Sequence, residues 1–255
     1  TRTAQKERAP QHDRTPVWLD IRSRRPRHPP TLRGMTFSIA GRCARTGQLG
    51  AVVTTSGFAS GSRVPWAQAG VGAALTQHRT DPRLGPKMLA ALKAGKKPDA
   101  IMAELKQDEP GIGWRQLAVI AADGNAAYFN GHHITSTHKG RVGKDCVSVG
   151  NIIRRPDVVD AMIESFESKV NAEQPLAERL LRAIEAGHAA GGEWKQEKSA
   201  ALIVAHKESF PWVDLRVDFD PRPLDELRFL WENYQPMAED FVVRACDPDN
   251  AAPPV

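Results

Sequence analysis

The spacing of apolar residues divides the chain from Met35 onward into short strands and amphipathic helices. Apolar runs bounded by turn residues predict strands over 36–44, 49–55, 67–77, 116–121, 126–129, 146–149, 200–205 and 213–218. Helical spacing predicts two short helices within 85–105, on either side of a Gly95–Pro98 break, and further helices over 156–170, 175–186 and 223–234. Turns at Gly47 and at Asp123-Gly124 indicate hairpins.

The order of these elements predicts the fold class. Strands linked by hairpins favour antiparallel sheets, and the helices come in separate groups instead of alternating with single strands. We therefore expect an α+β fold with two mainly antiparallel sheets and helices outside them. A single domain is expected over 35–235, followed by a C-terminal tail at 236–255.

Residues 1–34 have a different composition from the rest. Nine Lys or Arg residues stand there against three Asp or Glu, together with five prolines and little periodic apolar content. This predicts a disordered tail or an extension upstream of the natural start. Because the formal net charge of the whole chain is +5, the remainder is close to neutral. Nucleic acid is therefore not an expected partner.

Composition excludes several classes of protein. The 255 residues are 41% hydrophobic and 25% charged, which is ordinary for a globular chain with a sizeable core. No apolar run has the ~18 residues typical of a membrane helix, so no membrane partner is expected. The three cysteines are too scattered for a disulfide framework, and a secretory leader is missing. We expect a cytoplasmic location.

Familiar catalytic and cofactor motifs are missing from the sequence, including the phosphate-binding loop, the dinucleotide fingerprint and G-x-S-x-G. The group His132, His133, His138 and Cys146 has a spacing that fits no common zinc pattern, so no metal and no cofactor are expected. Cys146 could act as a thiol nucleophile, but its Val147 and Val149 neighbours favour a small buried residue.

Thr36 is the candidate nucleophile, because it opens the first strand directly after a methionine. A threonine hydroxyl needs a base to become reactive. If Met35 were removed, the free α-amine of Thr36 would have a pKa of about 7.7–8.0 and could accept the hydroxyl proton itself. The alternative is that Thr36 simply begins a strand.

The sequence resembles the DUF1028 family over roughly residues 35–232. The matching segments occur in the same order at 35–42, 46–53, 64–73, 76–77, 81–86, 115–119, 149–152, 176–181, 189–192, 199–202 and 214–218. That family is similar to the N-terminal-nucleophile hydrolases, so the resemblance implies a four-layer α-β-β-α sandwich and amide hydrolysis. The chain departs from the family pattern at Glu193, where an aspartate is expected.

The resemblance also implies roles for particular side chains. Thr36 would be nucleophile and base, and Ser56 would relay the proton of the amine. Gln77, Gln116 and Asn151 would each offer an amide N–H to the oxyanion or the substrate. Arg216 would bind a substrate carboxylate. Hydrogen bonding at strand ends, for the three amides, and a solvated ion-paired face, for Arg216, are the structural alternatives.

Together these features predict an amidohydrolase that cleaves a small non-peptide amide, linear or cyclic, through an acyl-threonine ester. The expected partner is thus a small-molecule amide. A homo-oligomer is a further expectation, because some apolar helix faces look exposed. The competing hypothesis is a catalytically silent scaffold of the same fold that binds a metabolite or a protein.

Overall fold

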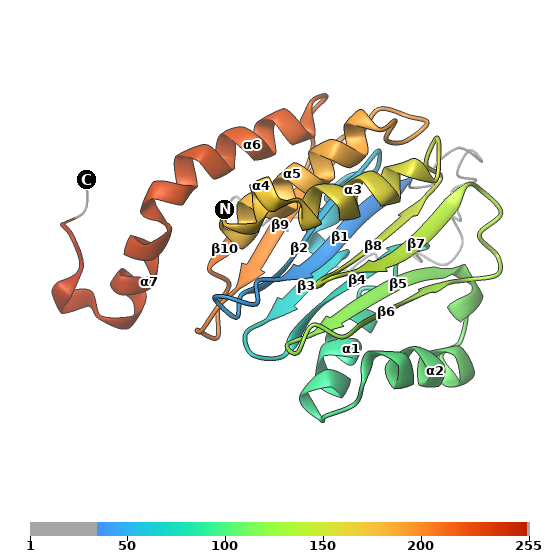
Figure 1. Cartoon of the computed structure of the whole chain (residues 1–255), viewed down its shortest axis with the longest axis horizontal. Coiled ribbons are helices and arrows are strands. Elements are labelled where there is room, and N and C mark those ends of the chain that lie inside the picture. The colour runs from blue at the N-terminus through green and yellow to red at the C-terminus, as the bar shows by residue number, and fades with distance from the viewer. Residues whose placement is uncertain (1–34, 254–255) are drawn as a thin grey trace, which may run out of the picture. The chain divides into compact units, whose positions relative to one another are not determined.

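The computed structural model describes residues 35–253, and the basic segment expected at 1–34 lies outside the described residues. Two antiparallel sheets form the centre of this unit (Figure 1). The six-stranded sheet has the order β10-β9-β2-β1-β8-β7. Its strands are β1 (Thr36–Arg42), β2 (Leu49–Thr55), β7 (His138–Gly143), β8 (Cys146–Asn151), β9 (Ser199–Ala205) and β10 (Val213–Val217).

The second sheet has four strands in the order β3-β4-β5-β6. They are β3 (Pro65–Gln68), β4 (Gly72–His78), β5 (Arg115–Ala121) and β6 (Ala126–Asn130). Helices α1 (Leu84–Lys93) and α2 (Pro98–Asp108) cover its outer face. Short 3-10 turns lie at Ser60–Ser62, Ile112–Trp114, Gln235–Met237 and Pro248–Asn250.

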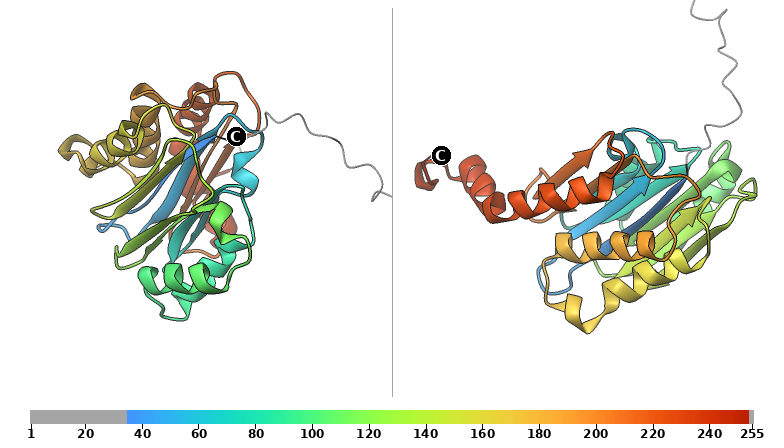
Figure 2. Two further views of the ribbon diagram at one scale, coloured as in Figure 1. Left: turned by 90° about the vertical axis from the view of Figure 1, so that its right-hand side faces the viewer. Right: turned by 90° about the horizontal axis from the view of Figure 1, so that it is seen from above.

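The outer face of the six-stranded sheet is covered by α3 (Asp157–Glu167), α5 (Leu176–Ala189) and α6 (Pro223–Tyr234), as the views in Figure 2 show. The short helix α4 (Lys169–Ala172) links α3 to α5, and α7 (Ala238–Cys246) follows α6. The layers therefore run helix, sheet, sheet, helix. The α+β class with two antiparallel sheets, expected from the sequence, is confirmed.

Strand alternation explains this layering. Along β1, Phe37 and Ile39 belong to the core under α3 and α5, whereas Ala40 belongs to the apolar layer between the two sheets. A third core lies under α1 and α2. The central strands β1, β2, β8 and β9 thus contribute one face to the helices and one face to the layer between the sheets.

Three features differ from the sequence-based expectation. The single strand expected over 67–77 is wrong, because Gly70 has a φ of +68° and turns the chain between β3 and β4. Strand β7 (His138–Gly143), in a segment for which the sequence predicts no strand, pairs with β8. Helix α5 continues through Gly187, where a Cβ would lie 2.8 Å from the Cγ of Met162, so the glycine permits close packing of α5 against α3.

The end of the chain also contains more structure than the tail expected at 236–255. Helix α7 places Ala238 in the core under α6 and packs Val242 against it. Phe241 of the same helix stacks on Tyr234 of α6, with ring centroids 5.4 Å apart. Between residues 35 and 253, no helix combines the length and the apolar character needed to cross a bilayer.

Candidate functional site

Polar residues replace apolar ones at one end of the layer between the sheets. Apolar side chains such as Ala40, Val53, Val149, Leu75 and Ala118 fill this layer. At the end where β1 begins, the same strand faces carry polar side chains. They are Thr36 and Ser38 on β1, Thr55 on β2, Asn151 on β8, Gln77 on β4 and Gln116 on β5. The described fold therefore brings four of the six predicted site residues to one place.

Thr36 begins β1, between the last residues of its two neighbouring strands. Its register partners are Thr55 on β2 and Asn151 on β8. The Thr36 hydroxyl donates to Thr55 Oγ1 at 3.4 Å, and the Thr55 hydroxyl donates in turn to the carbonyl oxygen of Met35. Thr36 is 5% exposed and Met35 is 7% exposed. The peptide bond between Met35 and Thr36 is thus held at the buried edge of the polar layer.

Gln77 fixes the start of β1 from the opposite sheet. Its Nε2 atom lies 3.3 Å from the carbonyl oxygen of Thr36, 3.3 Å from that of Val149 and 2.6 Å from Gln116 Oε1. Its Oε1 atom accepts the hydroxyl of Ser38 at 2.6 Å. Both amide hydrogens of Gln77 therefore have partners within the protein, and the side chain serves to hold the backbone of the candidate nucleophile.

Gln116 and Asn151 extend this amide network. Gln116 Nε2 lies 2.7 Å from Asn130 Oδ1 and 2.9 Å from the carbonyl oxygen of Gly150, while its Oε1 accepts from Asn151 Nδ2 at 3.0 Å. That bond uses one of the two amide hydrogens of Asn151, and its Oδ1 is buried without a hydrogen-bond partner. Among the three predicted amides in the described chain, Asn151 alone keeps unused hydrogen-bonding capacity.

Glu193 lies just beyond the start of β1. Its Oε2 accepts the backbone N–H of Ser56 at 2.9 Å, at the end of β2, and its own backbone forms a bridge with Ile153, beyond the end of β8. Because β2 and β8 flank β1, Glu193 spans the opening between them. The carboxyl is 2% exposed and its Oε1 has no partner. Burial raises the pKa of Glu193 well above its usual range, and the hydrogen bond from Ser56 offsets only part of this effect.

The hydroxyl that meets Thr36 belongs to Thr55, one residue before the predicted Ser56. Residues alternate along a strand, so Thr55 faces the inter-sheet layer together with its partner Thr36. Ser56 contributes its backbone N–H to Glu193 instead. The hairpin register, with Arg42 opposite Leu49, already implies the pairing of Thr36 with Thr55, so the position of the β1–β2 turn is the sequence signal for Thr55.

Arg216 is not brought to the polar cluster. It lies on β10, which β9 and β2 separate from β1. Its guanidinium lies 3.7 Å from Asp218, and a Cβ on Gly61 would lie 2.8 Å from its Nε. At about 4.8 Å between neighbouring strands, Arg216 is roughly 14 Å across the sheet from Thr36. The geometry favours the ion-paired face over a substrate carboxylate site.

Comparisons with known proteins agree with the resemblance in the sequence. The model of a family described as "Family of unknown function (DUF1028)" matches residues 36–227, beginning at Thr36 itself. The chain belongs to the DUF1028 family. A crystal structure of protein SPO2555 from Silicibacter pomeroyi, a protein matched by the same family model, is similar to it with a TM-score of 0.73 and 28% identity, over 79% of this chain and 86% of that chain. None of the curated proteins matches the sequence significantly.

The histidine-rich loop of the DUF1028 domain packs through its rings. His133 stacks on Trp114 with ring centroids 4.4 Å apart, and His132 contacts His133 at 4.1 Å. Burial raises the pKa of Cys146 to about 12, so its thiol stays protonated and belongs to the core under α3. Within residues 35–253, no three His, Cys, Asp or Glu side chains are grouped so that they could hold a metal.

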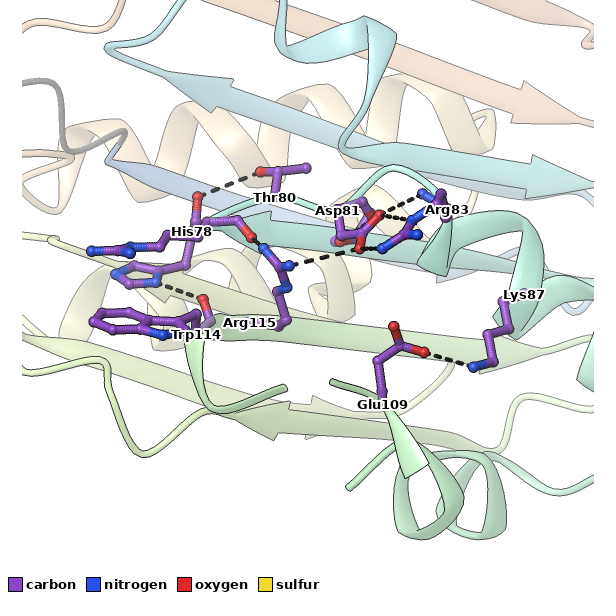
Figure 3. A network of polar contacts seen from close by, with 10 residues as sticks. His78, Thr80, Asp81, Arg83, Lys87, Glu109, Trp114 and Arg115 are labelled. Carbon is purple, nitrogen blue, oxygen red and sulfur yellow. Dashed lines mark hydrogen bonds and ion pairs between the residues drawn. The ribbon is translucent and has the colours of Figure 1, made fainter. Parts of the chain in front are cut away.

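Beside Gln77 and Gln116, an ion-pair network ties β4 and β5 of the DUF1028 domain together (Figure 3). Asp81 accepts Nε of Arg83 at 2.9 Å, and Arg115 lies 3.7 Å from the same carboxylate. The hydrogen bond from Arg83 lowers the pKa of Asp81 to about 2. Arg79 lies over the ring of Trp114 at 3.6 Å from its centroid. These contacts fix the residues that follow Gln77 and precede Gln116.

A surface pocket of about 630 Å³ opens at the other end of the strands, where Trp66, Leu89 and Phe210 are among its lining residues. It includes Ala205, which pairs with Leu49 at the end of β2 far from Thr55. None of the predicted site residues lines this pocket. The polar cluster at Thr36 therefore remains the site that the chemistry of the side chains favours.

Proposed function

We propose that this DUF1028 protein is an amidohydrolase in which Thr36 attacks a small non-peptide amide, linear or cyclic, after its α-amine has been released from Met35. The observation that carries the proposal is the position of Thr36, as the first residue of a central strand with the Thr55 hydroxyl and the Asn151 amide on either side. A nucleophile needs a nearby base and a donor for the oxyanion, and in this proposal the released α-amine would be the base and the Asn151 side chain the donor.

The reaction would use the two functional groups of Thr36. The hydroxyl oxygen forms a bond to the amide carbon while the α-amine accepts the hydroxyl proton. The tetrahedral oxyanion accepts the spare N–H of Asn151, and the protonated amine then gives its proton to the departing nitrogen. Water hydrolyses the resulting threonine ester with the same amine as base, which restores the free hydroxyl.

Removal of Met35 would serve the reaction in two ways. It creates the α-amine, whose ordinary pKa of about 7.7–8.0 is close to neutrality. It also removes a residue that is only 7% exposed directly before Thr36, which would open space at the start of β1.

The decisive experiment uses protein expressed from Met35, from which host aminopeptidase removes the methionine before the small Thr36. The described fold and its three cores lie within residues 35–253, so this protein retains them. Intact mass verifies the new terminus, and a panel of linear and cyclic amides is assayed by mass spectrometry. We expect turnover that Thr36→Ala abolishes and that Thr46→Ala, in the β1–β2 turn, leaves intact. Equal turnover by Thr36→Ala would refute the mechanism.

Asn151 gives a second test of the same site. Removing one oxyanion donor typically lowers kcat by about 10²–10³, so Asn151→Ala is expected to lose this much turnover while keeping its circular dichroism. Turnover that stays within twofold of the parent would exclude Asn151 as the donor.

A binding scaffold without catalysis is the second candidate, and one observation favours it. The amide hydrogens of Gln77 and Gln116 are used within the protein, which leaves fewer donors for a substrate. Calorimetry with the same amide panel separates the two candidates. A scaffold binds an amide equally well with Thr36 or Ala at position 36 and never releases a product.

The proposal also includes a cytoplasmic location and self-association. Cys43, Cys146 and Cys246 are all free thiols, which suits a reducing compartment. Phe229 and Phe241, on α6 and α7, are 59% and 38% exposed and would suit contact with a second copy. Fractionation of the native host and light scattering of the purified protein test these two points.

A further inference from the structure

We infer that Glu193 is the positioning residue for the α-amine of Thr36, holding it as an ion pair at the start of β1. The inference rests on the proposed release of that amine, but it does not depend on amide hydrolysis. Its basis is the location of a buried carboxyl with an unused oxygen at the point where the new terminus would form.

The register of the sheet places the carboxyl. Thr36 pairs with Thr55 and with Asn151, so the next row beyond the start of β1 contains Ser56 on one side and Ile152 on the other. Glu193 contacts both sides of this opening, through the N–H of Ser56 and through the bridge to Ile153. An amine at the end of β1 would emerge between these two contacts.

The loop that carries Glu193 is itself held firmly. Arg154 Nε donates to the backbone carbonyl of Glu193 at 2.8 Å, and the backbone N–H of Glu193 donates to Glu197 Oε1 at 3.3 Å. Glu197 is in turn paired with His188 at 3.3 Å. The carboxyl of Glu193 is therefore fixed in place, although only one of its two oxygens has a hydrogen-bond partner.

No cation of the described residues satisfies this carboxyl. The charged and titratable side chains of the adjoining segments are Arg154, Arg155, His188, Lys195, Glu197 and Lys198, together with His138, the partner of Asn151 on β7. Arg154 is bonded to the backbone of residue 193, His188 is bonded to Glu197, and Arg155 donates to the carbonyl of Ala190. An ammonium group at Thr36 would supply the missing positive charge and a donor for Oε1.

The negative charge of Glu193 determines in which direction the pKa of the Thr36 amine should shift. A carboxylate close to an amine favours the protonated amine and raises its pKa, and an opposite charge within about 4–6 Å typically shifts a pKa by 1–3 units. Glu193→Gln removes the charge but keeps an acceptor for the N–H of Ser56. The pKa of the Thr36 amine should therefore fall in this variant.

The test measures the amine directly. Protein with a free Thr36 is carbamoylated with cyanate from pH 5 to 9, beside a Thr-Phe-Ser-Ile reference peptide, and the N-terminal fragment is quantified by mass. The rate follows the unprotonated fraction of the amine. We expect the midpoint of the rate against pH to lie about one pH unit or more lower in Glu193→Gln than in the parent. The midpoint of Glu193→Asp should stay closer to that of the parent.

Glu109→Gln is the control, since it removes a carboxylate that is 11% exposed and pairs with Lys87 on α1, in the other helix layer. Its midpoint should agree with the parent. An unchanged midpoint in Glu193→Gln, or an equal shift in both variants, would overturn the inference. Amide turnover is measured on the same samples. If the carbamoylation midpoint shifts in Glu193→Gln but the parent turns over no amide, the role of Glu193 is supported and the proposed hydrolase is contradicted. If the parent turns over an amide but the midpoint does not shift, the hydrolase is supported and the role of Glu193 is contradicted.

Discussion

Two buried glutamates of this domain have opposite surroundings. Glu178, on α5, is 8% exposed and is bound by Arg182, by Arg228 at 2.7 Å and by the indole N–H of Trp231 at 2.9 Å. Glu193 is 2% exposed and receives one N–H, that of Ser56. The first carboxylate is fully compensated by cations, whereas the second lacks a counter-charge among the described residues.

The difference shows in the pKa of each group. Burial alone would raise the pKa of Glu178, but the hydrogen bonds from Arg182 and Arg228 hold it below its usual range. Burial raises the pKa of Glu193 well above it. A compensated carboxylate joins α5 to α6 and serves stability, while an uncompensated one at a strand end is typical of a functional site.

The largest loss of unfolding free energy is expected on substitution of Glu178. Glu178→Gln leaves two arginines beside a neutral side chain, and breaking a buried ion pair in this way costs about 3–5 kcal/mol of unfolding free energy. Urea denaturation at pH 7 measures the loss. Glu185→Gln, which removes the more exposed partner of Arg228, should cost less. Equal losses of unfolding free energy in the two variants would mean that burial does not determine how much these ion pairs stabilise the fold.

In protein that keeps Met35, Glu193→Gln should raise the free energy of unfolding, whereas Glu178→Gln lowers it. Near pH 8 the folded parent must either keep this carboxyl protonated or bury it as an unpaired charge, and Glu193→Gln avoids that cost, so the variant should be more stable by about 1–3 kcal/mol. Because the raised pKa means that the folded state binds the proton more tightly, the parent loses stability as pH rises above about 4.3, and the two proteins should converge below that pH. If Glu193→Gln were less stable than the parent at pH 8, Glu193 would stabilise the fold as Glu178 does.

Asp81 provides an intermediate case with a smaller expected effect. Its carboxylate is 7% exposed, but its main partner Arg83 is 80% exposed, so solvent screens the pair. Asp81→Asn should cost about 1 kcal/mol at pH 7. The lowered pKa of about 2 means that this stability is present above pH 4 and is lost as pH falls towards 2. Acid titration of unfolding in parent and variant checks the window.

Most of the fold could be predicted from the sequence because it depends on local patterns. Hairpin turns at Gly47 and Gly124 and the alternation of apolar residues predict β1, β2, β5 and β6 well. The turn at Gly70 is not predicted, because nothing in the local pattern distinguishes a turn glycine from a packed one. Strand β7 contains a single strongly apolar residue, Val142, and forms through backbone pairing with β8.

The residues of the candidate site also fall into those that local sequence predicts and those that depend on long-range contacts. Thr36, Gln77, Gln116 and Asn151 could be singled out because each stands at a strand end within a recognisable segment. The role of Thr55 required the hairpin register. The position of Glu193 depends on tertiary structure, since a loop after α5 brings it to Ser56 from 137 residues away. Local sequence carries no information about that contact.

The central position of β1 has a consequence for dynamics. Phe37, Ile39 and Ala40 are completely shielded, and both edges of the strand are paired, with β2 and with β8. Amides in such a strand exchange with deuterium only when the whole domain opens. The backbone that follows Thr36 should therefore be among the last segments to exchange, so the candidate nucleophile is mounted on a rigid element whose motion is coupled to global unfolding.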